Sequence, residues 1–403
     1  MDNLINIKKY GFSEVFSSEI PEDDPLEPAR VLSQEKGFYR VVTDNGEKLA
    51  EVSGKFRFQT TVPSEYPVVG DFVLVNWNES GNSAIIESLL PRKSAFIRKA
   101  AGESQQEQVV AANIDTVFLC MALNNDFNLR RLERYISIAW NSGAMPVVVL
   151  TKSDLCDDLE NKLSEVSSIA FGIDILVTTS MEEDGYKELL PFISEGKTIA
   201  IIGSSGVGKS TMINRLLGKE YLKTNGLRND DKGRHTTTRR ELFLLPSGGM
   251  VIDTPGMREF GMWDNDTGIE RTFTDIEELA SQCKFRNCTH TNEPGCAIRS
   301  ALTMGELQID RWQSYQKLKA ENDYIEDKES YMIAKGKREK EISKPNLANE
   351  LCSLFCGIGN SHAYSSSRSE SRKRAMLVFF RQRAMIKIVK SSCKVGKLML
   401  SFG

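Results

Sequence analysis

The eight residues from Gly203 to Ser210 read GSSGVGKS and fit the pattern G-x-x-x-x-G-K-[ST] of loops that bind nucleotide phosphates. An apolar run, TIAII, precedes them and a helical segment, TMINRLL, follows, which is the strand, loop and helix setting that the motif requires. Backbone N–H groups would surround the phosphates, while Lys209 would reach the β and γ oxygens and stabilise their charge during transfer. The predicted contacts come from Gly203, Ser204, Ser205, Gly206, Val207, Gly208, Lys209, Ser210 and Thr211.

A second group of residues could hold the Mg²⁺ ion of a bound nucleotide. The hydroxyl of Ser210 is one candidate ligand, and Asp253 is another because it ends the apolar strand in MVIDTPG. The N–H of Gly256 can meet the γ-phosphate. A further hydroxyl is expected from the threonine run 236–238, in which Thr237 is the middle member; the sequence alone does not choose among the three.

The segment TKSD, from Thr151 through Lys152 and Ser153 to Asp154, follows the buried apolar run MPVVVL and suits the recognition of guanine. Guanine presents N1–H and N2–H₂ side by side, and one carboxylate, that of Asp154, can accept both hydrogen bonds. Lys152 would lay its stem across the purine. Thr151 stands where such motifs usually have asparagine, and Thr178–Ser180 could close over the base as a weaker motif. Taken alone, TKSD is also typical of a helix cap.

Three cysteines and a histidine lie within fourteen residues, at Cys283, Cys288, His290 and Cys296. Three thiolates and one imidazole are a complete tetrahedral set, which favours a structural Zn²⁺ site over a catalytic site with an open position. The alternative is four unrelated reduced side chains.

The elements that must position these residues divide the chain into five parts. Residues 1–29 are a polar extension; short β-type runs with regular turns over 30–97 favour a small barrel, with a β-sandwich fragment as the alternative. Alternating strands and helices over 98–270 indicate an α/β domain with a mostly parallel sheet, and 271–345 combine the Cys/His cluster with charged helices. The tail, 346–403, is serine-rich and basic; it is either an arm that attracts phosphate or a segment without a selected role.

Composition limits the possible classes of protein. The chain has 403 residues, 40% of them hydrophobic and 27% charged, which is typical of a globular protein of two or three domains. It contains no apolar run of membrane-spanning length and begins without a secretory signal, so we expect a cytoplasmic protein that does not bind membranes. The formal net charge of −3 neither requires nor excludes a nucleic-acid partner.

The motifs stand in the order base reader, phosphate loop, threonine run and Mg²⁺ aspartate, which is a circular permutation of the familiar GTPase order. Permutation is tolerated because the same strands can assemble with their ends joined elsewhere. The sequence therefore predicts a permuted GTPase domain.

Over about residues 30–345 the chain resembles the RsgA family of ribosome small-subunit-dependent GTPases, also called YjeQ. The resemblance rests on YPVVGDFV, LPRKSAFIRKA, TKSD, GSSGVGKST, GRHTTTRRE, DTPGMREF and CKFRNCTHTNEPGCAI. It implies an N-terminal OB-fold β-barrel, a circularly permuted P-loop GTPase domain and a C-terminal zinc-binding domain. It also implies Mg²⁺ with GTP, one structural zinc per chain, and a role in late maturation of the small (30S) ribosomal subunit through its rRNA. We expect a monomer.

The resemblance also bears on catalysis. Family members lack the glutamine after D-x-P-G that positions water in many GTPases, and this chain has Met257 there; the family's proposed substitute is a histidine before the threonine run, which is His235. His235 could instead only cap or pack its loop. A GTP-dependent RNA-binding switch, or another translation-related GTPase, is the alternative function. Basic residues near the domain joins, such as Arg92 and Lys93, favour RNA over a metabolite as the partner.

Overall fold

The structure, a computed structural model, describes residues 6–22, 24–35, 37–77, 83–99, 107–182, 184–221, 240–253 and 266–323. All of them lie in the first of the two units into which the chain divides, Met1–Tyr331. His235, the threonine run 236–238 with Thr237, Gly256 and Met257 lie outside the described residues, as does the tail.

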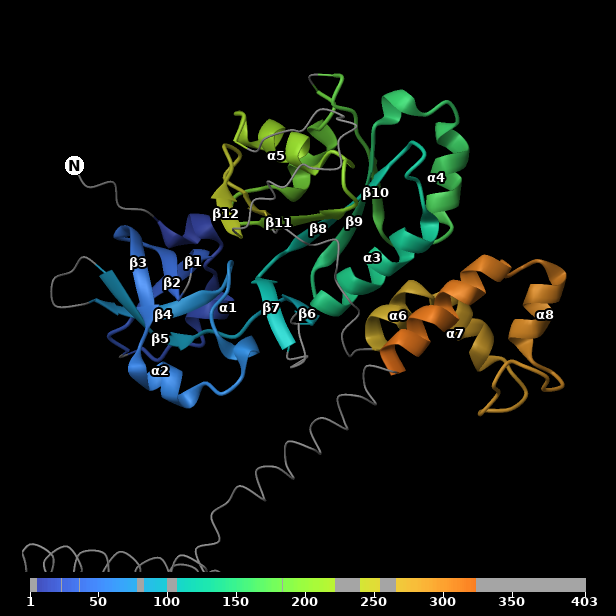
Figure 1. Ribbon diagram of the computed structural model, residues 1–403, viewed down its shortest axis with the longest axis horizontal. Coiled ribbons are helices and arrows are strands. Elements are labelled where there is room, and N and C mark those ends of the chain that lie inside the picture. Colours follow the sequence, from blue (N-terminus) through green and yellow to red (C-terminus); the bar gives the residue numbers. More distant parts are fainter. Residues whose placement is uncertain are drawn as a thin grey trace, which may run out of the picture. The chain divides into compact units, whose positions relative to one another are not determined.

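A closed five-stranded barrel forms the N-terminal part (Figure 1). Its strands are β1 (Glu27–Glu35), β2 (Phe38–Thr43), β3 (Gly46–Val52), β4 (Phe72–Trp77) and β5 (Ser83–Leu89). They pair in the order β1-β2-β3-β5-β4 and β4 pairs back with β1; β3 and β5 run parallel and all other pairs antiparallel. Alternating residues such as Val31, Val41 and Val73 fill the interior, because successive side chains of a strand face opposite sides.

Short helices surround the barrel: η1 (Ile7–Tyr10), α1 (Glu14–Ser17), α2 (Gly54–Gln59) and η2 (Pro63–Glu65). The N-terminal segment contributes to a core, since the fully buried Phe16 of α1 packs on Phe72 with ring centroids 4.3 Å apart. β1 begins at Glu27, so the sequence-predicted domain boundary at residue 30 falls inside this strand.

An antiparallel pair, β6 (Ala95–Lys99) and β7 (Glu107–Ala112), leads into the α/β domain. Its strands are β8 (Thr116–Ala122), β9 (Met145–Thr151), β10 (Asp174–Val177), β11 (Thr198–Gly203), β12 (Glu241–Leu244) and β13 (Met250–Asp253). They are ordered β10-β9-β8-β11-β13-β12, parallel except for β12, and β12 pairs with β1 at Glu241 and Ser33 to continue the sheet into the barrel.

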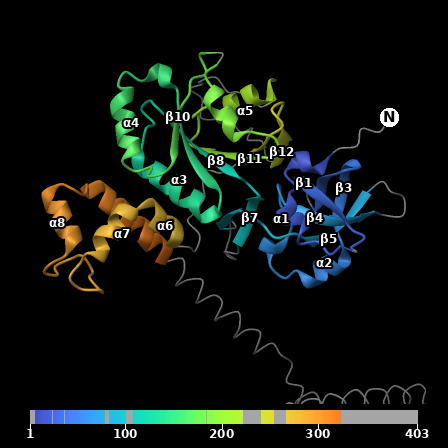
Figure 2. The ribbon, with the colours of Figure 1, turned by 180° about the vertical axis from the view of Figure 1, so that it is seen from behind.

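Helices cover both faces of this sheet: α3 (Leu129–Ser142), α4 (Leu159–Ser167) and α5 (Lys209–Leu217), with the 3-10 helices η3 (Ser153–Leu155) and η4 (Lys187–Phe192) (Figure 2). β8 is buried along its whole length. Its Val117, Leu119 and Met121 share a core with α3 and α4, while Phe118 and Cys120 share another with α5. A strand covered on both faces in this way is typical of a parallel α/β sheet.

Arg30 joins the barrel to the α/β domain. Its guanidinium is fully buried and donates to the carbonyls of Gly70 and Asn113 at 3.2 and 3.1 Å, and to Thr198 Oγ1 at 2.9 Å. It also donates to the carbonyl of Tyr10. Burial lowers the pKa of Arg30 to about 10, yet the group stays charged near neutral pH. Thr198 begins β11, so this side chain connects the barrel with the strand that leads into the phosphate loop.

The C-terminal described part is helical: α6 (Asp266–Thr272), α7 (Thr274–Ser281), α8 (Ala297–Met304) and a helix over 309–323. Ile269, Phe273, Ile276 and Ile298 form its core, with Tyr315 and Leu318 from the last helix. None of the helices in the described part of the chain is both long and apolar enough to span a bilayer.

Candidate functional site

The predicted phosphate loop begins at Gly203, the last residue of β11, and its Lys209 and Ser210 are the first two residues of α5. Gly206 and Gly208 have φ angles of +73° and +106°, which only glycine adopts without strain. Gly203 is required for space, because a Cβ there would lie 2.8 Å from the carbonyl oxygen of Cys120. Lys209 Nζ donates to the carbonyls of Gly203 and Ser204 at 2.7 and 2.6 Å, which holds the ammonium group against the loop.

Asp253 lies at the carboxyl end of β13, beside β11, on the edge of the sheet that carries the phosphate loop. Desolvation raises the pKa of its carboxyl to about 6; the charge of Lys209 opposes this rise and that of Glu241 adds to it. A partly buried carboxylate close to the Lys209 ammonium suits a divalent cation, because a cation bound there favours the ionised form.

The predicted base reader also lies on this edge. β9 ends at Thr151, Lys152 has a left-handed φ of +60°, and Ser153–Leu155 form the single turn η3. Thr179 Oγ1 donates to Asp154 Oδ1 at 2.7 Å, so the weaker motif Thr178–Ser180 contacts the reader directly and orients its carboxylate. The N–H of Ser153 donates to the carbonyl of Thr178 at 3.3 Å. The structure therefore brings together the two segments that the sequence predicts to bind the base.

Thr151 connects the base reader with the phosphate loop. Its buried hydroxyl donates to the carbonyl of Val207 at 2.7 Å. The two residues are far apart in sequence, and their contact follows from the positions of β9 and β11 on either side of β8. Although Thr151 replaces the usual asparagine, it still holds the base reader and the phosphate loop together, and these two segments would bind opposite ends of a nucleotide.

Besides the bond from Thr151 to Val207, sequence reasoning missed a contact between the phosphate loop and Asp126. The hydroxyl of Ser204 donates to the carboxylate of Asp126, which follows β8 and precedes α3. The available signal was the polar run NND, residues 124–126, directly after a buried strand, where carboxyl ends of parallel strands gather functional groups.

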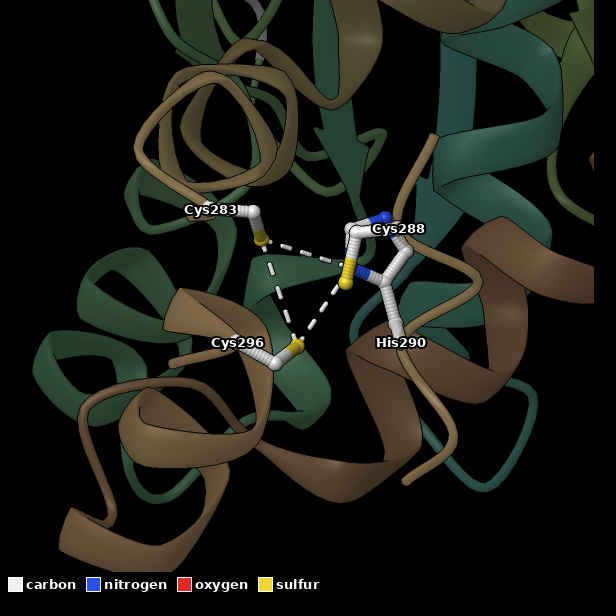
Figure 3. A group of neighbouring side chains, drawn as sticks. All are labelled: Cys283, Cys288, His290 and Cys296. Atoms are coloured by element: carbon white, nitrogen blue, oxygen red, sulfur yellow. Dashed lines mark hydrogen bonds between the residues drawn. The ribbon is translucent and has the colours of Figure 1, made fainter. Parts of the chain in front are cut away.

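The predicted metal ligands meet in the C-terminal helical part (Figure 3). Three sulfur atoms and one ring nitrogen point toward a common centre and lie within 4.8 Å of one another. His290 Nδ1 is 3.6 Å from Cys283 Sγ and 3.5 Å from Cys296 Sγ, and the two sulfurs are 4.0 Å apart. Zn–S bonds of about 2.3 Å and a Zn–N bond of about 2.0 Å in a tetrahedron imply roughly 3.8 Å between sulfurs and 3.5 Å from sulfur to nitrogen. The donor set therefore fits zinc in both chemistry and size.

Local structure supports these four side chains. Cys283 follows α7 and Cys296 is the N-cap residue of α8, whose Ala297 N–H lies 3.4 Å from Cys283 Sγ. The Glu293 carboxylate accepts from the N–H groups of Thr289 and Thr291 at 2.9 and 3.0 Å and closes the loop that carries His290. Hydrogen bonds from Thr289 lower the pKa of Glu293 to about 2. The loop is thus shaped by its own contacts as well as by any metal.

Both the sequence and the fold of this chain are similar to those of known proteins. The profile of the RsgA GTPase family matches residues 89–263. The small ribosomal subunit biogenesis GTPase RsgA 2 of Lactiplantibacillus plantarum is 47% identical over 321 residues, which are 79% of this chain and 90% of that relative. This chain belongs to the RsgA GTPase family.

Other members and solved structures agree. RsgA 1 of Oceanobacillus iheyensis is 43% identical over 83% of this chain and 97% of its own length. The crystal structure of YjeQ from Thermotoga maritima superposes with a TM-score of 0.56 at 26% identity, covering 74% of this chain and 98% of that chain. YloQ, described as a circularly permuted GTPase, has a TM-score of 0.54 over 77% of this chain and 98% of its own; at 24% identity it supports the fold alone. The predicted permuted GTPase fold is confirmed, and this RsgA family member is a hydrolase that acts on GTP.

Proposed function

We propose that this RsgA family member hydrolyses GTP while it assists late maturation of the small (30S) ribosomal subunit, and that the subunit stimulates its turnover. The observation that carries the proposal is one edge of the sheet that brings together the phosphate loop, Asp253 and the predicted base reader, in a chain 47% identical to a protein named for small ribosomal subunit biogenesis. The role in subunit biogenesis is inferred from the names of the relatives, and GTP hydrolysis is supported by the arrangement of the site in this chain.

We assign the roles within the site as follows. The loop from Gly203 to Thr211 surrounds the phosphates, and Lys209 balances the charge that develops on the transferred group. Thr151, Lys152, Ser153 and Asp154 bind guanine, with Asp154 accepting from its N1–H and N2–H₂. The N–H of Gly256 meets the γ-phosphate.

Two metals belong to the proposal. Mg²⁺ bound with GTP offsets the charge of the β- and γ-phosphates, and its proposed ligands are Ser210, Asp253 and one of the threonines 236–238, with Thr237 as the candidate. One zinc per chain, held by Cys283, Cys288, His290 and Cys296, would be structural, because four protein ligands leave no position open for chemistry.

We propose the domains that the sequence predicts, except that the barrel begins with β1 at Glu27 rather than at residue 30: an extension, an OB-fold RNA-binding domain (to 97), a permuted GTPase domain (98–270), a zinc-binding helical domain (271–345) and a tail of unassigned role (346–403). The pairing of the barrel strands supports an OB-fold, a partly Greek-key barrel that binds nucleic acid on one face. Arg92 is a poor candidate for rRNA, since it donates to both carboxylate oxygens of Asp71 at 2.8 Å. A ribosomal partner implies a cytoplasmic protein, and we propose a monomer.

His235 is our candidate for positioning the attacking water, because the thioether of Met257 has no donor and accepts only weakly. Intrinsic hydrolysis would then be slow, and docking on the subunit would bring His235 into position for the attacking water. The alternative role is to cap or pack that loop.

The test is GTP turnover by the full chain with and without purified small ribosomal subunits. We expect the subunits to raise kcat, while an equal concentration of large subunits does not. Ser210→Ala should lose turnover under both conditions, because removing a Mg²⁺ ligand uncovers phosphate charge. Equal turnover with and without small subunits would instead favour a GTP-dependent RNA-binding switch or another translation-related GTPase.

A further inference from the structure

The segment that leads into α3 contacts the phosphate loop through Asp126. The hydroxyl of Ser204 donates to one oxygen of Asp126, and Arg131 on the first turn of α3 pairs with the other oxygen at 3.0 Å. Asn128 caps the helix by accepting from the N–H of Arg131 at 2.9 Å. The loop is thus fixed to the start of α3 through a carboxylate that is itself held by that helix.

A carboxylate is electrostatically unfavourable beside a loop that binds triphosphate. The guanidinium of Arg131 offsets part of this negative charge. A neutral side chain at position 126 would nevertheless repel the phosphates less than Asp126 does. Asp126 makes up for this repulsion by holding the phosphate loop in position. By fixing Ser204, it fixes the carbonyl of Ser204, which accepts from Lys209 Nζ at 2.6 Å.

The middle of α3 is bound to the C-terminal helices. Glu133 is fully buried and accepts from Arg311 at 2.8 Å and from Arg130 at 2.6 Å. Arg311 also donates to both oxygens of Asp275, at 2.8 and 2.6 Å. Because a buried ion pair is costly to break, these contacts fix α3 against α7 and the last helix.

Close backbone packing adds to this anchor. A Cβ on Gly268 of α6 would lie 2.4 Å from the carbonyl oxygen of Ser137 on α3, and Ser137 Oγ lies 3.0 Å from Thr272 Oγ1. Burial raises the pKa of the Glu133 carboxyl, although Ser314 and the two arginines oppose this rise. Helix α3 is thus linked to the phosphate loop through Asp126 and Arg131 at its start, and it contacts the C-terminal helices through Glu133 and Ser137.

We propose that Asp126 is a positioning residue of the phosphate loop, and that α3 couples the loop to the C-terminal helices through Glu133 and Arg311. A change in how these helices hold α3 therefore changes the affinity for GTP. This coupling needs GTP binding by the loop but not a ribosomal partner, so it can hold or fail independently of the proposed role in subunit biogenesis.

The first test uses the sign of the effect of Asp126→Ala on GTP affinity. Positioning predicts weaker binding, roughly tenfold for loss of a hydrogen bond to a charged group, with kcat changed much less than KM. Ser204→Ala should give a similar loss of affinity. The double variant should bind GTP no more weakly than the weaker-binding single variant, because both substitutions remove the same hydrogen bond between Ser204 and Asp126. Asp126→Asn, which keeps an acceptor for the hydroxyl, should recover part of the affinity.

Tighter GTP binding by Asp126→Ala would overturn the proposal, since removing a negative charge alone has that effect. Additive losses in the double variant would also overturn it, because they would show that the two side chains act independently.

The second test measures coupling with Glu133→Gln in the zinc-loaded full chain. We expect GTP affinity to fall by roughly fivefold, the lower end of ordinary coupling between sites, and we expect this fall to disappear in the Asp126→Ala background. Arg134→Gln is the matched control, because Arg134 also pairs with the last helix, at Glu321, but both side chains are about one third exposed. It should leave GTP affinity unchanged.

A Glu133→Gln variant with lower thermal stability and unchanged GTP affinity would overturn the coupling. If that variant does not fold, Ser137→Ala tests the same interface with a smaller change, since it removes one hydroxyl contact to Thr272. An unchanged GTP affinity in Ser137→Ala at measurably reduced stability would then be the overturning result.

Discussion

Thr151→Val keeps the shape of a buried side chain and removes the hydroxyl that binds the base reader to the phosphate loop. Thr151 and Val207 are 4% and 1% exposed, so water has little access to the Val207 carbonyl once the hydroxyl is gone. Leaving a buried acceptor unpaired costs about 1–3 kcal/mol. In the free protein the two loops can move apart and relieve part of this cost, whereas a bound nucleotide contacts both loops and prevents that movement. At about 1.4 kcal/mol per tenfold, the affinity should fall by roughly fivefold or more.

The assay is equilibrium binding of a fluorescent GDP analogue, with thermal unfolding measured on the same samples. Thr151→Ser is the control, because it keeps the hydroxyl and loses a methyl group; its affinity should stay close to that of the parent chain. An unchanged Kd for Thr151→Val, with or without a loss of stability, would refute the reasoning, since it would show that the bond does not prepare the two loops for the nucleotide.

Four further predictions concern other parts of the molecule. Asp154→Asn should shift preference from GTP toward XTP in competition binding, because the amide can donate to the O2 of xanthine; retained GTP preference would exclude Asp154 as the base reader. Removing zinc, or Cys288→Ala with loss of about one zinc per chain, should unfold the region 283–296 and abolish subunit-stimulated turnover while basal GTP binding largely persists; zinc-free protein of full activity would contradict this. Arg30→Met should lower the free energy of unfolding by roughly 2–5 kcal/mol, because it leaves buried carbonyls unpaired, and Arg30→Lys should restore little since an ammonium lacks the planar fork; chemical denaturation that finds both variants as stable as the parent would refute it. His235→Ala should lose subunit-stimulated single-turnover hydrolysis with nucleotide and subunit binding intact, and parental stimulation would remove the catalytic role.

Local motifs could be predicted from the sequence because their geometry is encoded within a few residues. The phosphate loop needs glycines where φ is positive and a helix directly after it, and both requirements are visible in GSSGVGKST. The Cys/His cluster spans fourteen residues, and its spacing alone indicates the four donor side chains that the structure brings together. The permuted order was also readable, since it is simply the order of the motifs along the chain.

Contacts between distant segments could not be predicted in this way. The bond from Thr151 to Val207 depends on β9 and β11 both lying beside β8, and the bond from Ser204 to Asp126 depends on the loop after β8 lying at the same edge. Arg30 reads as an ordinary polar residue at the start of a strand until the fold surrounds it with carbonyls. In each case the partner is set by sheet order, which no short window of sequence contains.

Because of the circular permutation, the barrel and the C-terminal helices are joined to particular strands of the GTPase sheet. β13, which ends at Asp253, is the last strand of the GTPase sheet in the described part of the chain, so the sequence proceeds from the proposed Mg²⁺ ligand to the C-terminal helices. The barrel is joined at the other side, through β1 to β12 and through Arg30 to the first residue of β11. Two of the described attachments, Arg30 to β11 and the C-terminal helices to α3, therefore lead to the elements that hold the phosphate loop. A partner that holds both the barrel and the C-terminal helices would accordingly act on phosphate geometry more than on base selection, which is the division expected of a GTPase whose turnover is set by docking.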